Sequence, residues 1–117
     1  MLSGISLGLS ALKAIQTRTQ STANNTANVN TDGFKKTRVT MVEAVPQGVT
    51  TNVQRMDTPG PMVYEPTQEG EVLVEKSNVD LTEELPQMLI DRRAFQANIK
   101  TIQAQDEMLG SLLDIKG

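Results

Sequence analysis

Residues 80–113 read DLTEELPQMLIDRRAFQANIKTIQAQDEMLGSLL, and they carry the strongest periodic pattern in the chain. Ten positions follow one another at alternating intervals of three and four residues, and eight of them are apolar. They are Leu81, Leu85, Met88, Arg92, Phe95, Ile99, Ile102, Asp106, Leu109 and Leu113. Such spacing places all ten on one face of an α-helix and is typical of a coiled-coil seam. The sequence therefore predicts a long carboxyl-terminal helix that pairs with another helix.

The start of this helix has signals of its own. Asp80 is a suitable N-cap and Glu83 follows three residues later, as in a capping box, so we expect the helix from about Leu81. These two acids and Glu84 are interpreted as cap and first-turn residues that complement the helix dipole, not as a catalytic group. Pro86 lacks a backbone N–H and crowds the preceding turn, so we expect a kink or a loosened turn there.

A second helical stripe occupies the amino end, from residue 2 to residue 26. Its members are again spaced by three and four residues, and they are apolar in the first half and small or polar in the second. They are Leu2, Ile5, Leu9, Leu12, Gln16, Thr19, Ala23 and Thr26. Gly4 and Gly8 each lower the helix propensity by about 1 kcal/mol relative to alanine. The stripe cannot drive stable pairing alone, and its small residues suit a place where two backbones approach closely.

The stretch ANNTANVNTDGFKK, residues 23–36, follows directly. Asn28 and Asn30, with the Thr-Asp-Gly turn that contains Gly33, are suited to ending a helix because asparagine and glycine tolerate left-handed backbone. Asn24 and Asn25 fall inside the predicted helix. Their amides either bond across a crowded helix–helix contact or belong to a polar helix end, and the sequence alone leaves both interpretations open.

The middle of the chain, residues 31–79, has a strand-like composition. TRVTMVEAV (37–45), GVTTNVQRM (48–56) and GEVLVEK (70–76) are rich in Val and Thr, and proline and glycine groups separate them, including the stretch from Pro66 to Gly70. With few aromatic residues this part is too poor in apolar bulk to form a robust core alone. We therefore expect an α+β fold in which long terminal helices, in residues 1–30 and 80–117, pair as an α-helical coiled coil and bracket a small β-rich middle insert (31–79).

Composition excludes several classes of function. The chain has no His, Cys or Trp, which removes the commonest acid–base group, the thiol nucleophile and the usual transition-metal ligands. We therefore expect no enzyme, no cofactor and no metal site. A net charge of −3 offers no cationic field for nucleic acid. No apolar run reaches the 18 residues that a membrane-spanning helix needs, and no signal-peptide pattern begins the sequence.

Two stretches resemble the bacterial flagellar rod and hook family: ANNTANVNTDGFKK near the amino end, and SNVDLTEELPQMLIDRRAFQANIKTIQAQDEML, residues 77–109, near the carboxyl end. The resemblance implies an axial structural subunit whose two terminal helices pack into the concentric layers of a helical tube. It also implies that Phe34 anchors the turn between helix and β region. The assembly residues expected from the stripes and the resemblance are Ile5, Leu9, Leu12, Asn24, Asn25, Asn28, Asn30, Gly33, Phe34, Leu85, Met88, Phe95, Asn98, Ile99, Ile102, Leu109 and Leu113.

The resemblance further implies a location and a set of partners. These are other copies of the chain, other rod and hook proteins, and the flagellar export apparatus, which carries such proteins to the periplasmic rod without a cleaved signal peptide. The short middle is most similar to a small proximal rod protein, whereas the carboxyl-terminal stretch resembles distal rod and hook subunits equally. A helical coiled-coil adaptor or binding module is the alternative from a different class.

Overall fold

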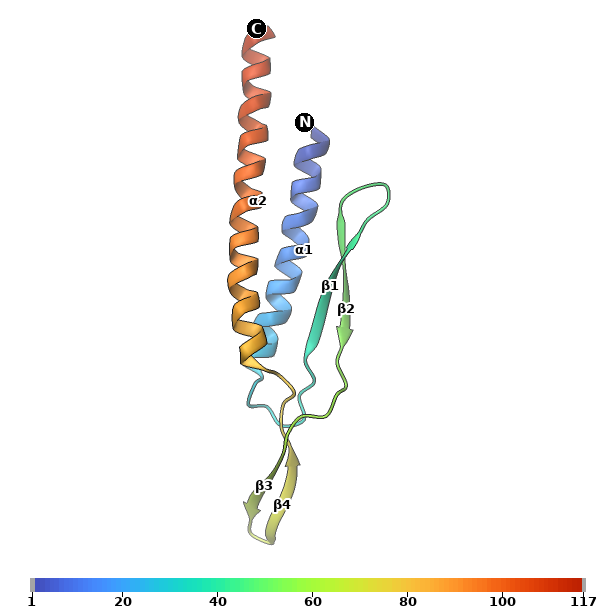
Figure 1. The fold of residues 1–117 in the computed structure, drawn as a ribbon, viewed down its shortest axis with the longest axis vertical. Helices are drawn as coiled ribbons and strands as arrows, with labels where there is room; N and C mark the ends of the chain where they lie inside the picture. The colour runs from blue at the N-terminus through green and yellow to red at the C-terminus, as the bar shows by residue number, and fades with distance from the viewer. Residues whose placement is uncertain (1, 117) are drawn as a thin grey trace.

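The computed structural model describes residues 2–116 and forms an elongated body with extents of 81 × 25 × 18 Å. Residues 1 and 117, which the predicted terminal segments include, and the side chain of Leu2 lie outside the described part. Two antiparallel helices lie side by side, with two β-hairpins between them in the sequence (Figure 1). The elements in order are α1 (Leu2–Ala27), β1 (Thr37–Glu43), β2 (Val49–Arg55), β3 (Met62–Thr67), β4 (Gly70–Glu75) and α2 (Leu81–Lys116). The predicted α+β class, with long helices at both ends, is confirmed.

Helix α1 ends at Ala27, where the asparagines begin a turn. The backbone N–H of Asn28 still bonds to the carbonyl of Asn24 (3.2 Å), and its side chain donates to the same carbonyl (2.8 Å). Gly33 then adopts a left-handed backbone, with φ of 71°, and its N–H donates to the Glu75 carbonyl (2.9 Å). The expected helix end and sharp turn are therefore present, because asparagine supplies local bonds and glycine supplies the positive φ.

The middle segment forms two separate antiparallel hairpins, not one sheet. In the first hairpin Thr37 pairs with Arg55, and in the second Met62 pairs with Glu75. Strand β3 was not expected, because Pro66 was interpreted as a breaker between strands. Both strands of a two-stranded ribbon are edges, and an edge position tolerates a proline whose missing N–H would point away from the partner strand.

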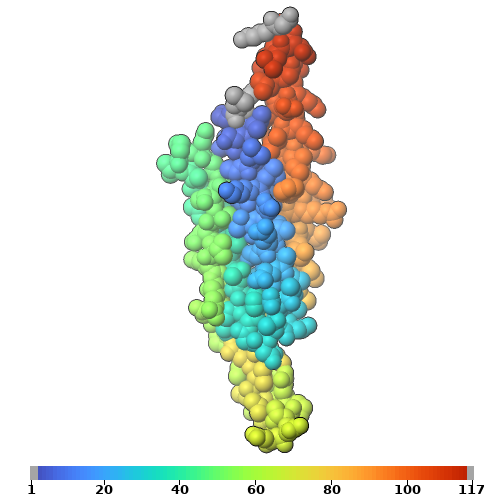
Figure 2. Space-filling view, turned by 180° about the vertical axis from the view of Figure 1, so that it is seen from behind, coloured from blue at the N-terminus to red at the C-terminus, as the bar shows by residue number. Residues whose placement is uncertain are grey.

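The two hairpins have different surroundings. The β1–β2 hairpin packs along α1, where the Ser10 hydroxyl accepts a hydrogen bond from the Val49 N–H (3.2 Å). The β3–β4 hairpin projects beyond the helices, at the end of the molecule opposite the two termini (Figures 1 and 2). At its base Gly60 is buried against residue 76, and a Cβ atom at Gly60 would lie 1.9 Å from the Lys76 carbonyl oxygen.

Helix α2 begins at Leu81, as expected. Asp80 Oδ1 accepts from the Thr82 hydroxyl (2.6 Å) and from the Thr82 N–H (3.0 Å), and these two bonds, the hydroxyl's first, lower the pKa of Asp80, so the predicted N-cap is present. In a full capping box the Glu83 carboxylate would bond back to the N–H of Asp80. Here that carboxylate instead forms an ion pair with Lys36 (3.2 Å). The helix also continues through Pro86 without a break. The carbonyl left without a donor belongs to Thr82, which is exposed, so water can satisfy it.

Little apolar surface is buried within one chain. Among the residues that the structure describes, Ala14 (3% exposed) and Ile15 (4%) are the buried apolar ones. Several larger side chains stay open instead, for example Leu85 (50%) and Leu113 (63%). A single copy therefore places its helices side by side without enclosing a conventional core.

Candidate functional site

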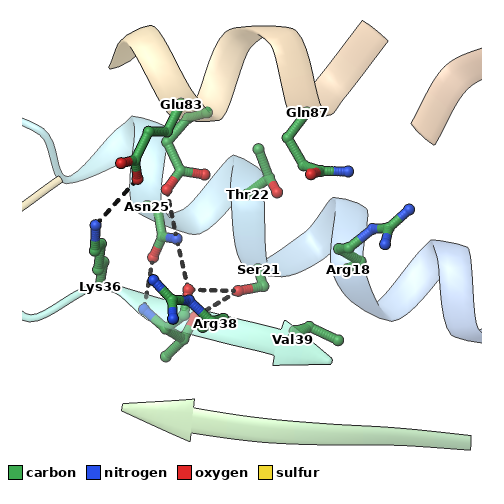
Figure 3. A pocket seen from close by; sticks show the side chains of 11 residues that line it. Arg18, Ser21, Thr22, Asn25, Lys36, Arg38, Val39, Glu83 and Gln87 are labelled. Atoms are coloured by element: carbon green, nitrogen blue, oxygen red, sulfur yellow. Dashed lines mark hydrogen bonds and ion pairs between the residues drawn. The ribbon is translucent and has the colours of Figure 1, made fainter. Parts of the chain in front are cut away.

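Asn25 connects the three main elements of the body where α1, α2 and β1 meet (Figure 3). The side chain is 2% exposed. Its Nδ2 donates to the Thr37 carbonyl (2.9 Å) and to Glu84 Oε1 (3.1 Å), while its Oδ1 accepts from the Thr37 N–H (3.0 Å). One amide thus extends the hydrogen bonding of β1 and holds the first turn of α2. A side chain with both donor and acceptor is required for this arrangement.

A second polar contact joins the helices two turns further along. Arg18 Nε donates to Asp91 Oδ1 (2.7 Å), and Gln87 Nε2 donates to the same oxygen (3.0 Å). Asp91 is 1% exposed, and its Oδ2 has no hydrogen-bond partner among the described residues. A buried carboxylate of this kind depends on its arginine, because removing one member of a buried pair leaves an uncompensated charge.

Glu84 is the titratable group of the junction. Burial raises the pKa of its carboxyl, and the hydrogen bond from Asn25 opposes that shift. The adjoining cavity has a volume of about 130 Å³ and is lined by residues of α1, of β1 and the residue before it, and of α2, all of them polar except Val39 (Figure 3). Sequence reasoning assigned Glu84 only to the helix dipole, whereas its carboxylate is in fact part of the contact between α1 and α2.

The line of α2 that faces α1 is polar and repeats every seven residues. It contains Glu84, Asp91, Asn98 and Gln105. Opposite it, a Cβ on Gly4 would lie 2.7 Å from Gln105 Nε2, and a Cβ on Gly8 would lie 2.8 Å from Ile102 Cγ1. The two glycines of α1 therefore leave room for side chains of α2, whereas the close approach expected at the small residues of the second half of the stripe stays a prediction. The polar seven-residue repeat is visible in the sequence, but a repeat alone does not show that this line, and not the apolar stripe beside it, faces α1.

The predicted seam is consequently displaced from the contact between α1 and α2. Its apolar stripe runs beside the polar line, and Ile102 of this stripe also lies against α1, at the position of Gly8. Leu85 is 50% exposed, Phe95 38% and Leu113 63%, while Met88 and Ile99 are half-buried. The sequence predicted a seam without naming the segment that covers it; within the chain, buried amides and charges occupy the contact between α1 and α2.

The other predicted residues divide by location. On α1, Leu9 is 56% exposed, while Ile5 and Leu12 are half-buried. Asn24 is exposed, and within residues 2–116 its side chain accepts a hydrogen bond from Asn28 Nδ2 (3.3 Å), one turn along the same helix, so it does not share the role of Asn25.

The remaining predicted residues make local bonds. Asn30 is exposed, and the Asn98 side chain donates to the Ala94 carbonyl of its own helix (2.8 Å). Phe34 is half-buried in the turn, and its carbonyl accepts from the Asn78 N–H (3.2 Å).

Within residues 2–116, no group of three or more His, Cys, Asp or Glu side chains is arranged to hold a metal ion. Neither of the two helices described is long and apolar enough to cross a membrane. Two features of α2 therefore remain as candidates for a functional role. One is the polar line buried against α1, and the other is the exposed apolar stripe beside it.

Comparison with known families matches both helices. The model described as Flagella basal body rod protein matches residues 5–35, which include most of α1 and its terminal turn. The model described as Flagellar basal body rod FlgEFG protein C-terminal matches residues 73–115, which include nearly all of α2. The chain belongs to the flagellar rod and hook family of axial structural proteins.

Individual relatives agree with this assignment over a shorter stretch. The flagellar hook protein FlgE of Treponema pallidum is 49% identical over 43 residues, or 37% of this chain and 9% of the relative. The flagellar basal-body rod protein FlgG of Bacillus subtilis is 47% identical over 43 residues, or 37% of this chain and 16% of the relative. FlgE of Escherichia coli is 42% identical over 43 residues, covering 37% and 11%. The chain thus matches only a small part of the length of these relatives.

Proposed function

We propose that this chain is a structural subunit of the flagellar rod, and that it polymerises helically to form the drive shaft that transmits torque from motor to hook. Its partners in this proposal are further copies of itself and the neighbouring axial proteins. It reaches the periplasmic rod through the flagellar export apparatus. It performs no catalysis and needs no cofactor.

The observation that carries the proposal is the exposed apolar stripe on a helix that the family model matches. Leu85, Phe95 and Leu113 together leave a large apolar area open in a single chain. Full burial of such a side chain contributes about 1.5 to 3 kcal/mol of stabilisation. Contact with neighbouring subunits would bury these side chains and supply the stabilisation that a single chain lacks. Assembly would then complete the core, and ordering and polymerisation would be coupled.

The insert between the two family-matched segments favours a rod subunit over a hook subunit. Only residues 36–72 separate those segments here. The matched stretch is 16% of the rod relative from Bacillus subtilis but 9% of the hook relative from Treponema pallidum, so the rod relative carries less chain beyond the match than the hook relative does. A subunit with two short hairpins adds little bulk outside the helices, which suits a narrow shaft.

The test is deletion of the gene in its host, with complementation by the full chain. Swimming in soft agar measures function, and electron microscopy of isolated basal bodies measures how far the axial structure extends. We expect non-motile cells whose basal bodies lack a complete rod, and recovery of both properties on complementation.

The same images separate the alternatives. Complete rods without hooks would identify a hook subunit in place of a rod subunit. Normal motility of the deletion strain, with the chain absent from isolated basal bodies of the parent, would refute an axial role altogether.

A further inference from the structure

Two charged residues interrupt the apolar stripe of α2, and they have opposite signs. Arg92 and Asp106 are fourteen residues apart, which is two heptads, so both lie on the stripe. Both are exposed, and neither has an ion pair among the described residues. A stripe that packed only within its own chain would gain nothing from a charge at either position.

We propose that a second copy of this chain packs its α2 parallel to the first, staggered by fourteen residues, so that Asp106 of one copy pairs with Arg92 of the next. The inference rests on the proposed function, and it names the register of the contact. At a rise of 1.5 Å per residue, this stagger displaces neighbouring copies by about 21 Å along the helix axis.

The stagger also matches the apolar positions of the stripe. Leu109 of one copy faces Phe95 of the next, Leu113 faces Ile99, and Ile102 faces Met88. Apart from one charged layer, which contains one acid and one base, all layers of the contact are therefore apolar on both sides. An aligned parallel pair would instead place Arg92 against Arg92 and Asp106 against Asp106, which is unfavourable.

Charges beside the stripe favour the same register. The stagger brings Glu107 to the height of Arg93 and Asp114 to the height of Lys100, so three acids near the end of α2 meet three bases near its middle. These flanking pairs are exposed, and their attraction is weak and sensitive to salt.

An antiparallel pair centred on Ile99 would also join Arg92 to Asp106. However, it would bring Arg93 to the height of Gln105 and Lys100 to the height of Asn98, so the flanking bases would no longer meet acids. It would also be a closed pair, whereas a filament needs a contact that repeats in one direction.

The surface that would receive the second copy is already hollowed. A groove of about 610 Å³ lies beside the contact between α1 and α2, with Gln16 and Thr19 on one side and Met88, Arg92 and Phe95 on the other. The carboxyl end of α2, which would enter the groove of the next copy, extends past the start of α1 (Figure 1). The part of α2 past Gln105, the residue opposite Gly4, could therefore reach the groove of a parallel neighbour, whereas Ile102 also lies against Gly8 of its own α1.

Cysteine cross-linking tests the register directly, because the natural chain has no cysteine. Full-length chains carrying Ile99→Cys, Leu113→Cys or both would be expressed in the deletion strain, and isolated basal bodies would be oxidised and run on a non-reducing gel. We expect a ladder of multimers from the double variant and monomer from each single variant. Dimers from Ile99→Cys alone would indicate an antiparallel or aligned pair and overturn the proposal.

Charge exchange gives an independent measurement. Arg92→Asp or Asp106→Arg should each lower incorporation into basal bodies at least about tenfold, and the double exchange should restore it to within about threefold. Lys13→Asp and Glu71→Arg, exposed charges outside α2, are the matched controls. Single reversals that incorporate as well as these controls would refute the Arg92–Asp106 pair.

The outcomes also separate this inference from the proposed function. If the natural chain is absent from basal bodies, the axial role fails. If it is present and the double-cysteine variant incorporates without forming the ladder, the role stands and the fourteen-residue stagger is wrong.

Discussion

Replacement of Asn25 by alanine is the most informative single change in the body of the molecule. The variant would leave the N–H and the carbonyl of Thr37, and Glu84 Oε1, without their present partner. A buried polar group without a partner costs about 1 to 3 kcal/mol, and the lower value applies here because Thr37 is only half-buried and water can reach it. The Thr37 carbonyl keeps a weaker bond from Ser21 Oγ (3.4 Å), so the two groups left without a partner and this weakened one together cost about 2 to 3 kcal/mol.

Alanine returns a small part of this loss, because it is a better helix former than asparagine by several tenths of a kcal/mol. The expected net destabilisation of Asn25→Ala is therefore about 2 kcal/mol. Asn24→Ala is the matched control, since Asn24 is exposed and loses only contacts with Asn28. Its expected effect is within about 0.5 kcal/mol of zero.

Hydrogen exchange and chemical denaturation of the purified chain measure both variants. In Asn25→Ala the amide of Thr37 should exchange at least about tenfold faster, together with the rest of β1, and the unfolding midpoint should fall. In Asn24→Ala neither quantity should change appreciably. Equal effects of the two substitutions, or an unchanged Thr37 amide in Asn25→Ala, would show that the asparagine does not hold the junction.

Three further substitutions test other parts of the structure. Glu84→Gln should raise stability at neutral pH. Burial raises the pKa of the Glu84 carboxyl above 4.5, so the folded chain binds the carboxyl proton more tightly than the unfolded chain does. The stability of the natural chain therefore falls as pH rises from 4.5 through the folded pKa, and a neutral glutamine avoids this loss. Denaturation midpoints at pH 4 and pH 7 should show the gain mainly at pH 7, and an equal gain at both would contradict the assignment. Gly60→Ala should cost at least about 2 kcal/mol by calorimetry, since its Cβ would meet the Lys76 carbonyl at 1.9 Å, whereas Gly110→Ala, which meets nothing, should stabilise by up to about 1 kcal/mol. Gly33→Val should cost about 1 to 2 kcal/mol through backbone strain at a φ of 71°, and Gly33→Asn clearly less; equal thermal shifts would refute the strain.

Local signals in the sequence were sufficient for the boundaries of the helices. Asp80 caps α2 through a bond to a residue two positions away, and the turn after Ala27 is made by neighbouring asparagines and Gly33. Such contacts involve residues close in sequence, so their propensities act with little reference to the rest of the fold. The three-four spacing likewise predicted the extent of α2, since helical periodicity is a property of a single segment.

The strands were predicted less completely, and the reason is again physical. Val and Thr content indicated β1, β2 and β4, but it could not show that Pro66 would occupy an edge position in β3. Whether a proline is tolerated depends on whether its missing N–H faces a partner strand. That depends on pairing, which the sequence of one strand does not contain.

The choice of contact face was decided by tertiary structure alone. The apolar stripe and the polar line of Glu84 and Asp91 lie on adjacent faces of α2, and a hydrophobicity pattern favours burying the stripe. The chain instead places Asn25 and Arg18 of α1 opposite the polar line, because only there does each buried acid meet a donor from another segment. A polar group can be buried when it has a hydrogen-bond partner. The partner of Glu84 is Asn25, 59 residues away in the sequence, and the partner of Asp91 is Arg18, 73 residues away. Sequence determined that α2 has an apolar face, and the long-range pairing of charges and amides determined that this face stays open.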